Sequence, residues 1–278
     1  MSATTQPIFI IGTGRSGSRS MFKMLSGVPG VEIYHEFVCT HVQKLACLYF
    51  MNKISHEAAK QELMTLHGAG IHYSEADLWI DSSNKLSWLI QPLAELFPKA
   101  KFLNIVRDGR KVAGSFFYKL AAEIYDDRST AALTQWLADP SAVPVPPPEK
   151  KYWWNIPQPG QPFHDAFPGY SQFERICYHW QECNRVVRDG LAPLPDAQKL
   201  TVRLEDITKD PEILAQMIRF IGLDYQDDYF DYLQTPQNVF FPMDFKIAGP
   251  QLAAFEAICT PMMRELGYDG TELYDVKY

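Results

Sequence analysis

The chain has few cysteines and lacks a long apolar run, and both shortages exclude classes of protein. Its five cysteines (Cys39, Cys47, Cys177, Cys183 and Cys259) form no CxxC pair and no metal-ligand spacing. We therefore expect reduced core thiols, no metal site and a cytoplasmic location. No run reaches the roughly 20 apolar residues of a membrane-spanning helix, and the N-terminus has no signal-peptide pattern, so no membrane partner is expected.

An excess of positive charge is also missing, since the formal net charge is −7. A nucleic-acid-binding face needs many clustered Lys and Arg residues, so no nucleic-acid partner is expected. The basic residues near the motifs described below are nevertheless concentrated: Arg15, Arg19, Lys23, Lys85, Arg107, Arg110 and Lys111. That concentration favours a small anionic ligand. The length of 278 residues predicts one domain over 1–278 and gives no indication of oligomeric state.

Strand and helix patterns alternate along the chain. Apolar runs that predict strands lie at 8–11, 31–34, 78–80, 101–106 and 200–202. Patterns that predict helices lie at 18–25, 41–67, 86–97, 112–124, 173–187, 211–222 and 251–266. Such alternation predicts an α/β fold with a mainly parallel central sheet flanked by helices.

A glycine-rich loop, GTGRSGSRS from Gly12 to Ser20, joins the first predicted strand to the first predicted helix. Free N–H groups and the positive dipole at a helix N-terminus bind anions, most often phosphate. The loop matches GxGxxG, with Glu36 at the distance of a ribose-binding acid, and it also begins like a Walker A loop. However, Ser18 and Arg19 replace the Lys and Ser/Thr of that motif. The loop alone therefore predicts an anion site, and neither NAD nor ATP follows from it.

A second basic element follows the predicted strand 101–106. Arg107 stands at the carboxyl end of that strand, where ligands bind in open α/β sheets. Ser115 comes eight residues later, in the early turns of the next predicted helix. An arginine fork and a hydroxyl suit a second phosphate. The alternative is a surface arginine that pairs with Asp108.

Together these segments resemble the sulfotransferase family that uses 3′-phosphoadenosine-5′-phosphosulfate (PAPS). Arg15 to Ser20 is similar to the family's 5′-phosphosulfate loop, and Val106 to Arg110 with Ser115 is similar to its 3′-phosphate element. The stretches 84–106, 203–206 and 262–268 also have the family's pattern. The resemblance implies a P-loop-like fold, PAPS as co-substrate, no metal and, most simply, a small-molecule acceptor. A sulfuryl group carries less charge than a terminal phosphoryl group, so side-chain cations can replace Mg²⁺.

The resemblance also implies roles for individual residues. Those that would hold the donor are Arg15, Ser16, Gly17, Ser18, Arg19 and Ser20 at the 5′-phosphosulfate, and Arg107 and Ser115 at the 3′-phosphate. Arg15 and Lys85 would stabilise the leaving group. Lys246 is a candidate for the family's late phosphate contact.

The acceptor base is the least defined of these roles. Glu36 matches the base position of the tyrosylprotein and bacterial branch best, and His35 is the alternative. The cytosolic small-molecule branch carries a histidine base where this chain has Ser87. The base of that branch is therefore missing here, and the resemblance implies Glu36.

Residues 140–170 contain nine prolines interleaved with aromatic residues. Because proline blocks helices and removes backbone donors, this composition predicts an extended ordered insert or a mobile lid. Its aromatic side chains either pack on the body of the protein or wall the acceptor pocket.

Two other functions stay open at this point. An NAD(P)-dependent oxidoreductase would use the GxGxxG loop with Glu36 as the ribose-binding acid. A non-catalytic nucleotide-binding module would bind the same ligand and modify no acceptor.

Overall fold

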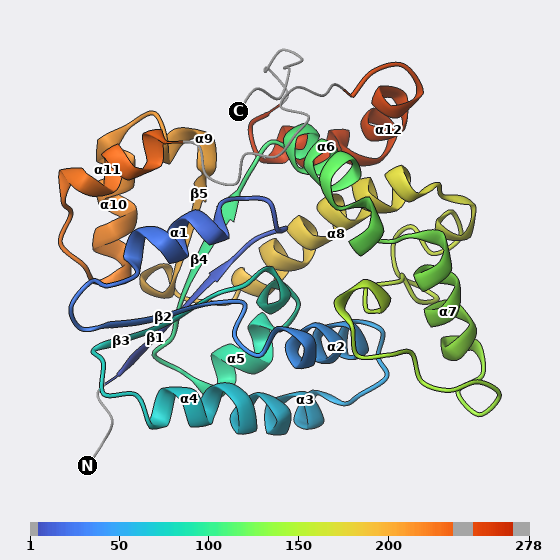
Figure 1. Ribbon diagram of the computed structural model, residues 1–278, viewed down its shortest axis with the longest axis horizontal. Coiled ribbons are helices and arrows are strands. Elements are labelled where there is room, and N and C mark those ends of the chain that lie inside the picture. The colour runs from blue at the N-terminus through green and yellow to red at the C-terminus, as the bar shows by residue number, and fades with distance from the viewer. Residues whose placement is uncertain (1–4, 236–246, 269–278) are drawn as a thin grey trace. The chain divides into compact units, whose positions relative to one another are not determined.

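Five parallel strands form the centre of the fold in the computed structural model, which describes residues 5–235 and 247–268. The strands are β1 (Gln6–Ile11), β2 (Val31–His35), β3 (Leu78–Ser82), β4 (Lys101–Val106) and β5 (Lys199–Arg203). They form one sheet in the order β2-β3-β1-β4-β5, and every neighbouring pair is parallel (Figure 1). The predicted α/β fold with a parallel sheet flanked by helices is confirmed.

The described chain divides into two compact units. The described residues of unit 1 are 5–38, 55–107 and 183–235, and they contain the whole sheet. The described residues of unit 2 are 39–54, 108–182 and 247–268. A single domain over 1–278 stays a prediction.

The strand order determines which loops meet in unit 1. In a parallel sheet all carboxyl ends lie at one edge, so the segments that follow β1, β2, β3 and β4 gather there. The standard dinucleotide-binding order places the second strand directly beside the first. Here β3 lies between β1 and β2, so the segment after β2 is one strand further from the glycine loop than in that fold.

One face of the sheet packs against α1 (Ser18–Leu25), α9 (Leu204–Ile207), α10 (Pro211–Ile221) and α11 (Asp227–Gln234). Ile8, Ile80 and Ile105 supply the sheet side of this core and are almost fully buried. Burying such a side chain contributes about 1.5–3 kcal/mol. This packing holds α1, whose N-terminus faces the loop after β1, firmly on the sheet.

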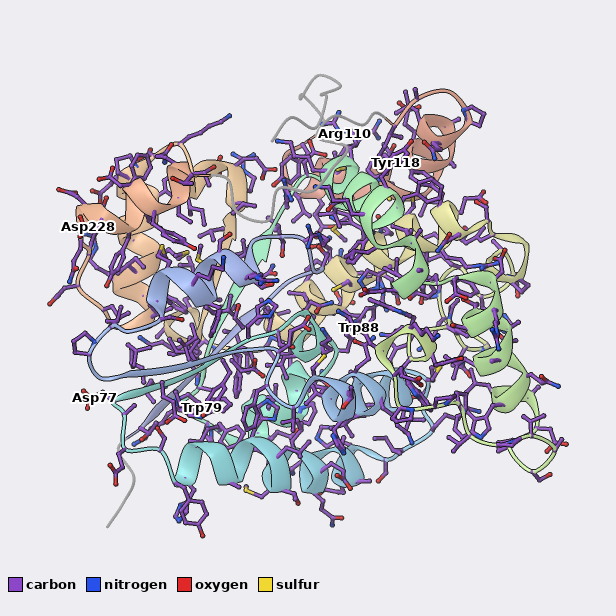
Figure 2. The ribbon with its side chains drawn as sticks, in the orientation of Figure 1. Asp77, Trp79, Trp88, Arg110, Tyr118 and Asp228 are labelled. Carbon is purple, nitrogen blue, oxygen red and sulfur yellow. The ribbon has the colours of Figure 1, made fainter. Side chains whose placement is uncertain are left out.

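The opposite face packs against α3 (His56–Leu63), the π-helical turn η1 (Met64–Gly68), α4 (Ala69–His72), η2 (Asn84–Trp88) and α5 (Ile90–Leu96). Trp79 of β3, labelled in Figure 2, packs against Gly70 of α4, and its ring is edge-on to His67 at 5.7 Å. Phe9 and Phe102 lie on the same face, with ring centroids 5.4 Å apart. This face is therefore built mainly from aromatic side chains.

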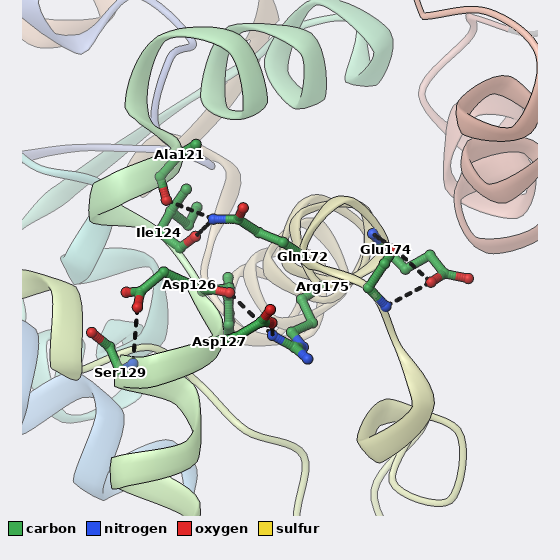
Figure 3. Close-up of polar contacts among 10 residues, drawn as sticks. Ala121, Ile124, Asp126, Asp127, Ser129, Gln172, Glu174 and Arg175 are labelled. Atoms are coloured by element: carbon green, nitrogen blue, oxygen red, sulfur yellow. Dashed lines mark hydrogen bonds and ion pairs between the residues drawn. The ribbon is translucent and has the colours of Figure 1, made fainter.

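Helices and the predicted insert make up unit 2. The helices are α2 (Cys39–Phe50), α6 (Gly109–Leu120), η3 (Ala121–Glu123), α7 (Asp127–Ala138), α12 (Pro250–Glu265) and most of α8 (Gln172–Leu191). Gln172 donates to the carbonyls of Ala121 and Ile124, and Arg175 pairs with Asp127 at 2.7 Å (Figure 3). These contacts join the end of α6 and the start of α7 to the first turn of α8.

The proline-rich insert contains two short turns, η4 (Lys150–Tyr152) and η5 (Phe167–Gly169). Its aromatic side chains pack into unit 2: Trp153 is fully buried and Trp154 nearly so. Trp153 donates from Nε1 to the carbonyl of Pro147 at 2.8 Å, and its own carbonyl accepts from Gln43 of α2. Around these residues the insert packs within unit 2, as an ordered insert would, and its role stays a prediction.

Two helix predictions differ from the structure, and two helices of the described chain with eight or more residues were not predicted. The stretch 41–67 is broken, because residues 51–54 form a turn and Ser55 caps α3 through its bond to the N–H of Ala58. The helix predicted to reach 124 ends at Leu120 and continues as η3. The sequence analysis missed α7, whose N-terminus is capped by Asp126, and α11.

Two further observations bear on the expectations from composition. None of the five cysteines, all of which lie in the described segments, forms a disulfide, and only Cys39 is not buried. Among the helices of residues 5–235 and 247–268, none is long and apolar enough to cross a membrane.

Candidate functional site

The loop after β1 delivers the chain to the N-terminus of α1. Gly17 is the residue before the helix, with φ of +105°, and α1 has neither a side-chain cap bond nor an acidic residue in its first turn. The N–H groups of this turn therefore face the loop without a carboxylate competing for them. Arg15 has a left-handed backbone with φ of +56°, and Arg19 is exposed on the first turn of α1. The arrangement favours an anion at this point.

Two positions of the loop favour glycine, Gly12 because backbone fills the place of a side chain and Gly17 mainly because its φ is +105°. A Cβ atom at Gly12 would lie 2.5 Å from the carbonyl oxygen of Ile105, and one at Gly17 would lie 2.9 Å from Cδ1 of Leu204. Gly12 is also held by Ser87, whose Oγ accepts from its N–H at 3.0 Å and donates to its carbonyl at 2.8 Å. Ser87, which stands where the cytosolic branch has its histidine base, therefore stabilises the loop through two hydrogen bonds.

The second basic motif reaches the same loop. Arg107, directly after β4, donates from Nη1 to the carbonyl of Arg15 at 2.8 Å. In unit 2, the carboxylate of Asp108 accepts from Arg110 at 2.7 and 3.0 Å and caps α6 through the N–H of that residue. The structure thus places Arg107 against the loop after β1, whereas Asp108 pairs with Arg110.

Glu36 and Lys85 form an ion pair at the carboxyl edge of the sheet. Lys85 donates from Nζ to Oε1 of Glu36 and to Oδ1 of Asn84, the latter at 3.0 Å. The lysine side chain is 2% exposed and the glutamate side chain 19%. A buried ammonium needs such a partner, because an uncompensated buried charge is strongly destabilising. The pair therefore depends on both residues.

Ser82 connects this pair to the glycine loop. Its carbonyl accepts the N–H of Glu36 at 3.1 Å, and its hydroxyl donates to the carbonyl of Ser18 at 2.9 Å. His35, the last residue of β2, also approaches α1, with its Nε2 3.5 Å from Oγ of Ser18. The end of β2, the end of β3 and the start of α1 are thereby joined.

The environment of His35 favours its neutral form. Burial is the main cause that lowers its pKa below the usual value, and Lys85 and Arg19 add to the effect. Glu36 and Asp81 oppose it with their negative charges. A neutral imidazole at Nε2 can accept a hydrogen bond from the Ser18 hydroxyl.

Almost all predicted site residues therefore lie in unit 1: Arg15, Ser16, Gly17, Ser18, Arg19, Ser20, His35, Glu36, Lys85 and Arg107. Ser115 is fully buried in α6 of unit 2, and Lys246 lies outside the described residues. The sequence analysis missed the connecting residues Ser82 and Asp81. A signal for them was present, because a polar run, DSSNK, directly follows the apolar start of β3.

A group of potential metal ligands lies elsewhere in unit 1. His56, Glu57 and Glu95 bring one ligand atom each within 4.8 Å of one another. The ammonium of Lys60 lies 3.1 Å from Oε2 of Glu95 and 3.2 Å from Oε1 of Glu57. Both carboxylates of the group are therefore already engaged by a cation.

Comparison with known proteins gives one family. Residues 7–142 match the model of the sulfotransferase family. No curated protein sequence matches the chain. The resemblance to sulfotransferases indicated by the two basic motifs is confirmed.

Several solved structures are similar to this chain. A sulfotransferase from Mycobacterium tuberculosis has 13% identity and a TM-score of 0.48, over 96% of this chain and 77% of that one. A sulfotransferase from Alicyclobacillus acidocaldarius has 14% identity and a TM-score of 0.40, over 92% of this chain and 96% of that one. A mouse sulfotransferase complexed with PAP has 14% identity and a TM-score of 0.35, over 82% of this chain and 62% of that one.

Proposed function

From the match to the sulfotransferase family, we propose that this chain transfers a sulfuryl group from PAPS to a hydroxyl or amine of a small-molecule acceptor. The observation that carries the proposal is the buried Lys85–Glu36 pair, which Ser82 connects to the N-terminal turn of α1. A carboxylate, an ammonium and an anion-binding helix N-terminus at one sheet edge are the groups that this transfer needs.

The donor would bind through its two phosphate-bearing ends. The N–H groups and hydroxyls of residues 16–20 would hold the 5′-phosphosulfate, with Arg15 and Arg19 supplying positive charge. Arg107, which is fixed beside the loop by its bond to Arg15, would bind the 3′-phosphate. The role of Ser115 at that phosphate rests on the resemblance alone.

The transfer itself is an in-line displacement at sulfur. The acceptor oxygen or nitrogen attacks and forms a new bond to sulfur, and its proton goes to the carboxylate of Glu36. The bond between sulfur and the bridging oxygen of the phosphosulfate breaks, and adenosine 3′,5′-bisphosphate leaves. Lys85 and Arg15 would stabilise the negative charge that grows on that oxygen.

Glu36 is proposed as the base in preference to His35 because of their contacts. The ammonium of Lys85 donates directly to the carboxylate of Glu36 and so stabilises its ionised form. A carboxyl group must be ionised before it can act as a general base. The nitrogen Nε2 of His35 instead lies within reach of the Ser18 hydroxyl, 3.5 Å away. His35 is thus suited to holding the first turn of α1, and Glu36 to taking a proton.

The strand order opposes the oxidoreductase alternative. A ribose-binding acid acts from the strand next to β1, whereas the strand before Glu36 is separated from β1 by β3. The non-catalytic module differs from a sulfotransferase only in the absence of transfer, so an assay must separate these two.

The test begins with calorimetric titration of the purified protein with adenosine 3′,5′-bisphosphate, MgATP and NAD(H). Metal-independent binding of the bisphosphate alone supports the proposal, and binding of NAD(H) or MgATP in its place overturns it. Sulfur-labelled PAPS is then offered with alcohols, phenols and amines. Bisphosphate binding without transfer to any of these acceptors would favour the non-catalytic module.

A further inference from the structure

A buried carboxylate lies beneath the proposed base. Asp81 is in β3, its side chain is fully buried, and its Oδ2 accepts from Nε2 of His67 at 3.0 Å. His67 is also fully buried and comes from the π-helical turn η1. The ring of Trp79 packs against His67 at 5.7 Å. A charged group in such aromatic surroundings is costly unless it has a specific partner.

The other oxygen of Asp81 reaches the segment that carries Glu36. Its Oδ1 accepts the main-chain N–H of Phe37 at 3.1 Å. Glu36 has φ of +59° and Val38 has φ of +45°, so two non-glycine residues with left-handed backbone flank the bonded amide. Each such conformation persists only where the surrounding structure enforces it.

Packing of the Phe37 ring acts on the same turn. The ring lies edge-on to Trp79 at 5.2 Å, to His67 at 5.5 Å and to Tyr34 at 4.8 Å. With the ring and the amide of Phe37 both held on this side of the sheet, the preceding residue meets Lys85 at the carboxyl edge. Asp81 and His67 thus lie where they determine the conformation of the Glu36 backbone.

We propose that Asp81, oriented by His67, is a positioning residue that holds the strained turn 36–38 and so aims Glu36 at the reacting group. This proposal rests on the proposed function of Glu36, because positioning matters to the reaction only if Glu36 takes the proton. Asp81 acts on Glu36 through the main-chain N–H of Phe37 and would itself touch no substrate.

Amide hydrogen exchange of the ligand-free protein tests the proposal without any activity assay. In Asp81→Ala the Phe37 amide loses its acceptor, and we expect its exchange to accelerate by about a hundredfold while the amides of β1 and β4 change far less. Asn104→Ala is the matched control, because it removes another buried polar side chain of the sheet, bonded to Thr201 at 3.3 Å. In the control, Phe37 should exchange within about threefold of the wild-type rate.

Equal acceleration at Phe37 in Asp81→Ala and Asn104→Ala would overturn the proposal, because it would reflect only general loss of stability. Asp81→Asn provides the measurement if Asp81→Ala does not fold. Its side chain has the same shape but is a weaker acceptor, so we expect about tenfold faster exchange at Phe37. An unchanged Phe37 rate in Asp81→Asn would also overturn it.

Titration of the same variants with adenosine 3′,5′-bisphosphate separates this proposal from the proposed function. The hydrogen bonds of the Asp81 carboxylate go to Phe37 and His67, away from the glycine loop, so the dissociation constant in Asp81→Asn should stay within about twofold of the wild-type value. If wild-type protein does not bind the bisphosphate, the proposed function fails while the exchange result still decides whether Asp81 holds the turn. If the variant loses bisphosphate binding, the assignment of Asp81 to the turn is wrong.

Discussion

Arg107 donates a hydrogen bond to the main-chain carbonyl of Arg15 at 2.8 Å, across 92 residues of sequence. The two arginines follow β4 and β1, which are parallel neighbours in the sheet, so their motifs emerge side by side. The contact explains how two motifs that are far apart in the chain can serve one anionic ligand. It also identifies Arg107 as a residue that both shapes the loop and adds positive charge to it.

Arg107→Ala should weaken the binding of adenosine 3′,5′-bisphosphate by about tenfold to a hundredfold, because a charge-assisted contact is lost. Arg107→Lys should recover only part of this loss, since an ammonium cannot replace the planar fork. Calorimetric titration measures both constants. Arg219→Ala is the control, because Arg219 is paired with Glu212 on the surface of α10. Equal affinities of Arg107→Ala and the control would contradict the assignment.

Local sequence patterns predicted the sheet and the loop well, because they depend on neighbours in the chain. The strand 101–106 and the helix 18–25 have the predicted bounds, and the helix is bordered on both sides by glycine-containing segments. The order β2-β3-β1-β4-β5 could not be predicted in this way, since it depends on which strands pair across long connections.

The candidate site could be predicted only in part, because several of its contacts also depend on which strands pair. The residue types of the loop and of Arg107 pointed to an anion, and the resemblance supplied Glu36 and Lys85. The double hydrogen bond between Ser87 and Gly12 joins residues 75 apart, and nothing in the local pattern around Ser87 indicates it. Likewise, the bond from Phe37 to Asp81 exists only once β2 and β3 pair.

Gly12→Ala should destabilise the protein by about 3 kcal/mol, because the new Cβ would meet backbone that cannot move aside. The predicted contact is 2.5 Å to the carbonyl oxygen of Ile105. Gly27→Ala is the matched control: Gly27 has φ of +86° but nothing within 4 Å of its Cβ position. It should cost only about 1 kcal/mol, for the backbone conformation. Urea unfolding measures both, and equal losses would refute the steric argument.

Trp153→Ala should destabilise the protein by about 3–5 kcal/mol, the usual cost of removing a buried tryptophan side chain. The residue is fully buried, and the ammonium of Lys44 lies 4.9 Å from the centre of its ring. Val145→Ala lies in the same insert but at a position that is 51% exposed, so its effect should be within about 0.5 kcal/mol. Similar small losses in both variants, measured by urea unfolding, would favour the lid interpretation.

His35 should make stability depend on pH. Its folded-state pKa is lowered, chiefly by burial, so below about pH 6.5 the unfolded chain binds a proton that the folded chain does not. The contribution of His35 to the free energy of unfolding is complete above that pH, and it is lost as the pH falls through the folded-state pKa. In His35→Gln this part of the pH dependence should disappear. Unfolding free energies measured between about pH 5 and pH 7.5 give the difference, and parallel curves for the two proteins would contradict the prediction.

Glu36→Gln should reduce sulfuryl transfer by about a hundredfold to ten-thousandfold, because general-base catalysis is lost. The affinity for the bisphosphate should stay nearly unchanged, because the loop that binds the donor is intact. The amide can still accept a hydrogen bond from Lys85, so the buried ammonium keeps a partner. His35→Gln is the decisive comparison. If Glu36 takes the proton, His35→Gln retains most of the transfer rate, whereas a base at His35 would reverse the two results. A third pattern, in which Glu36→Gln loses nucleotide binding together with activity, would assign Glu36 to ribose recognition.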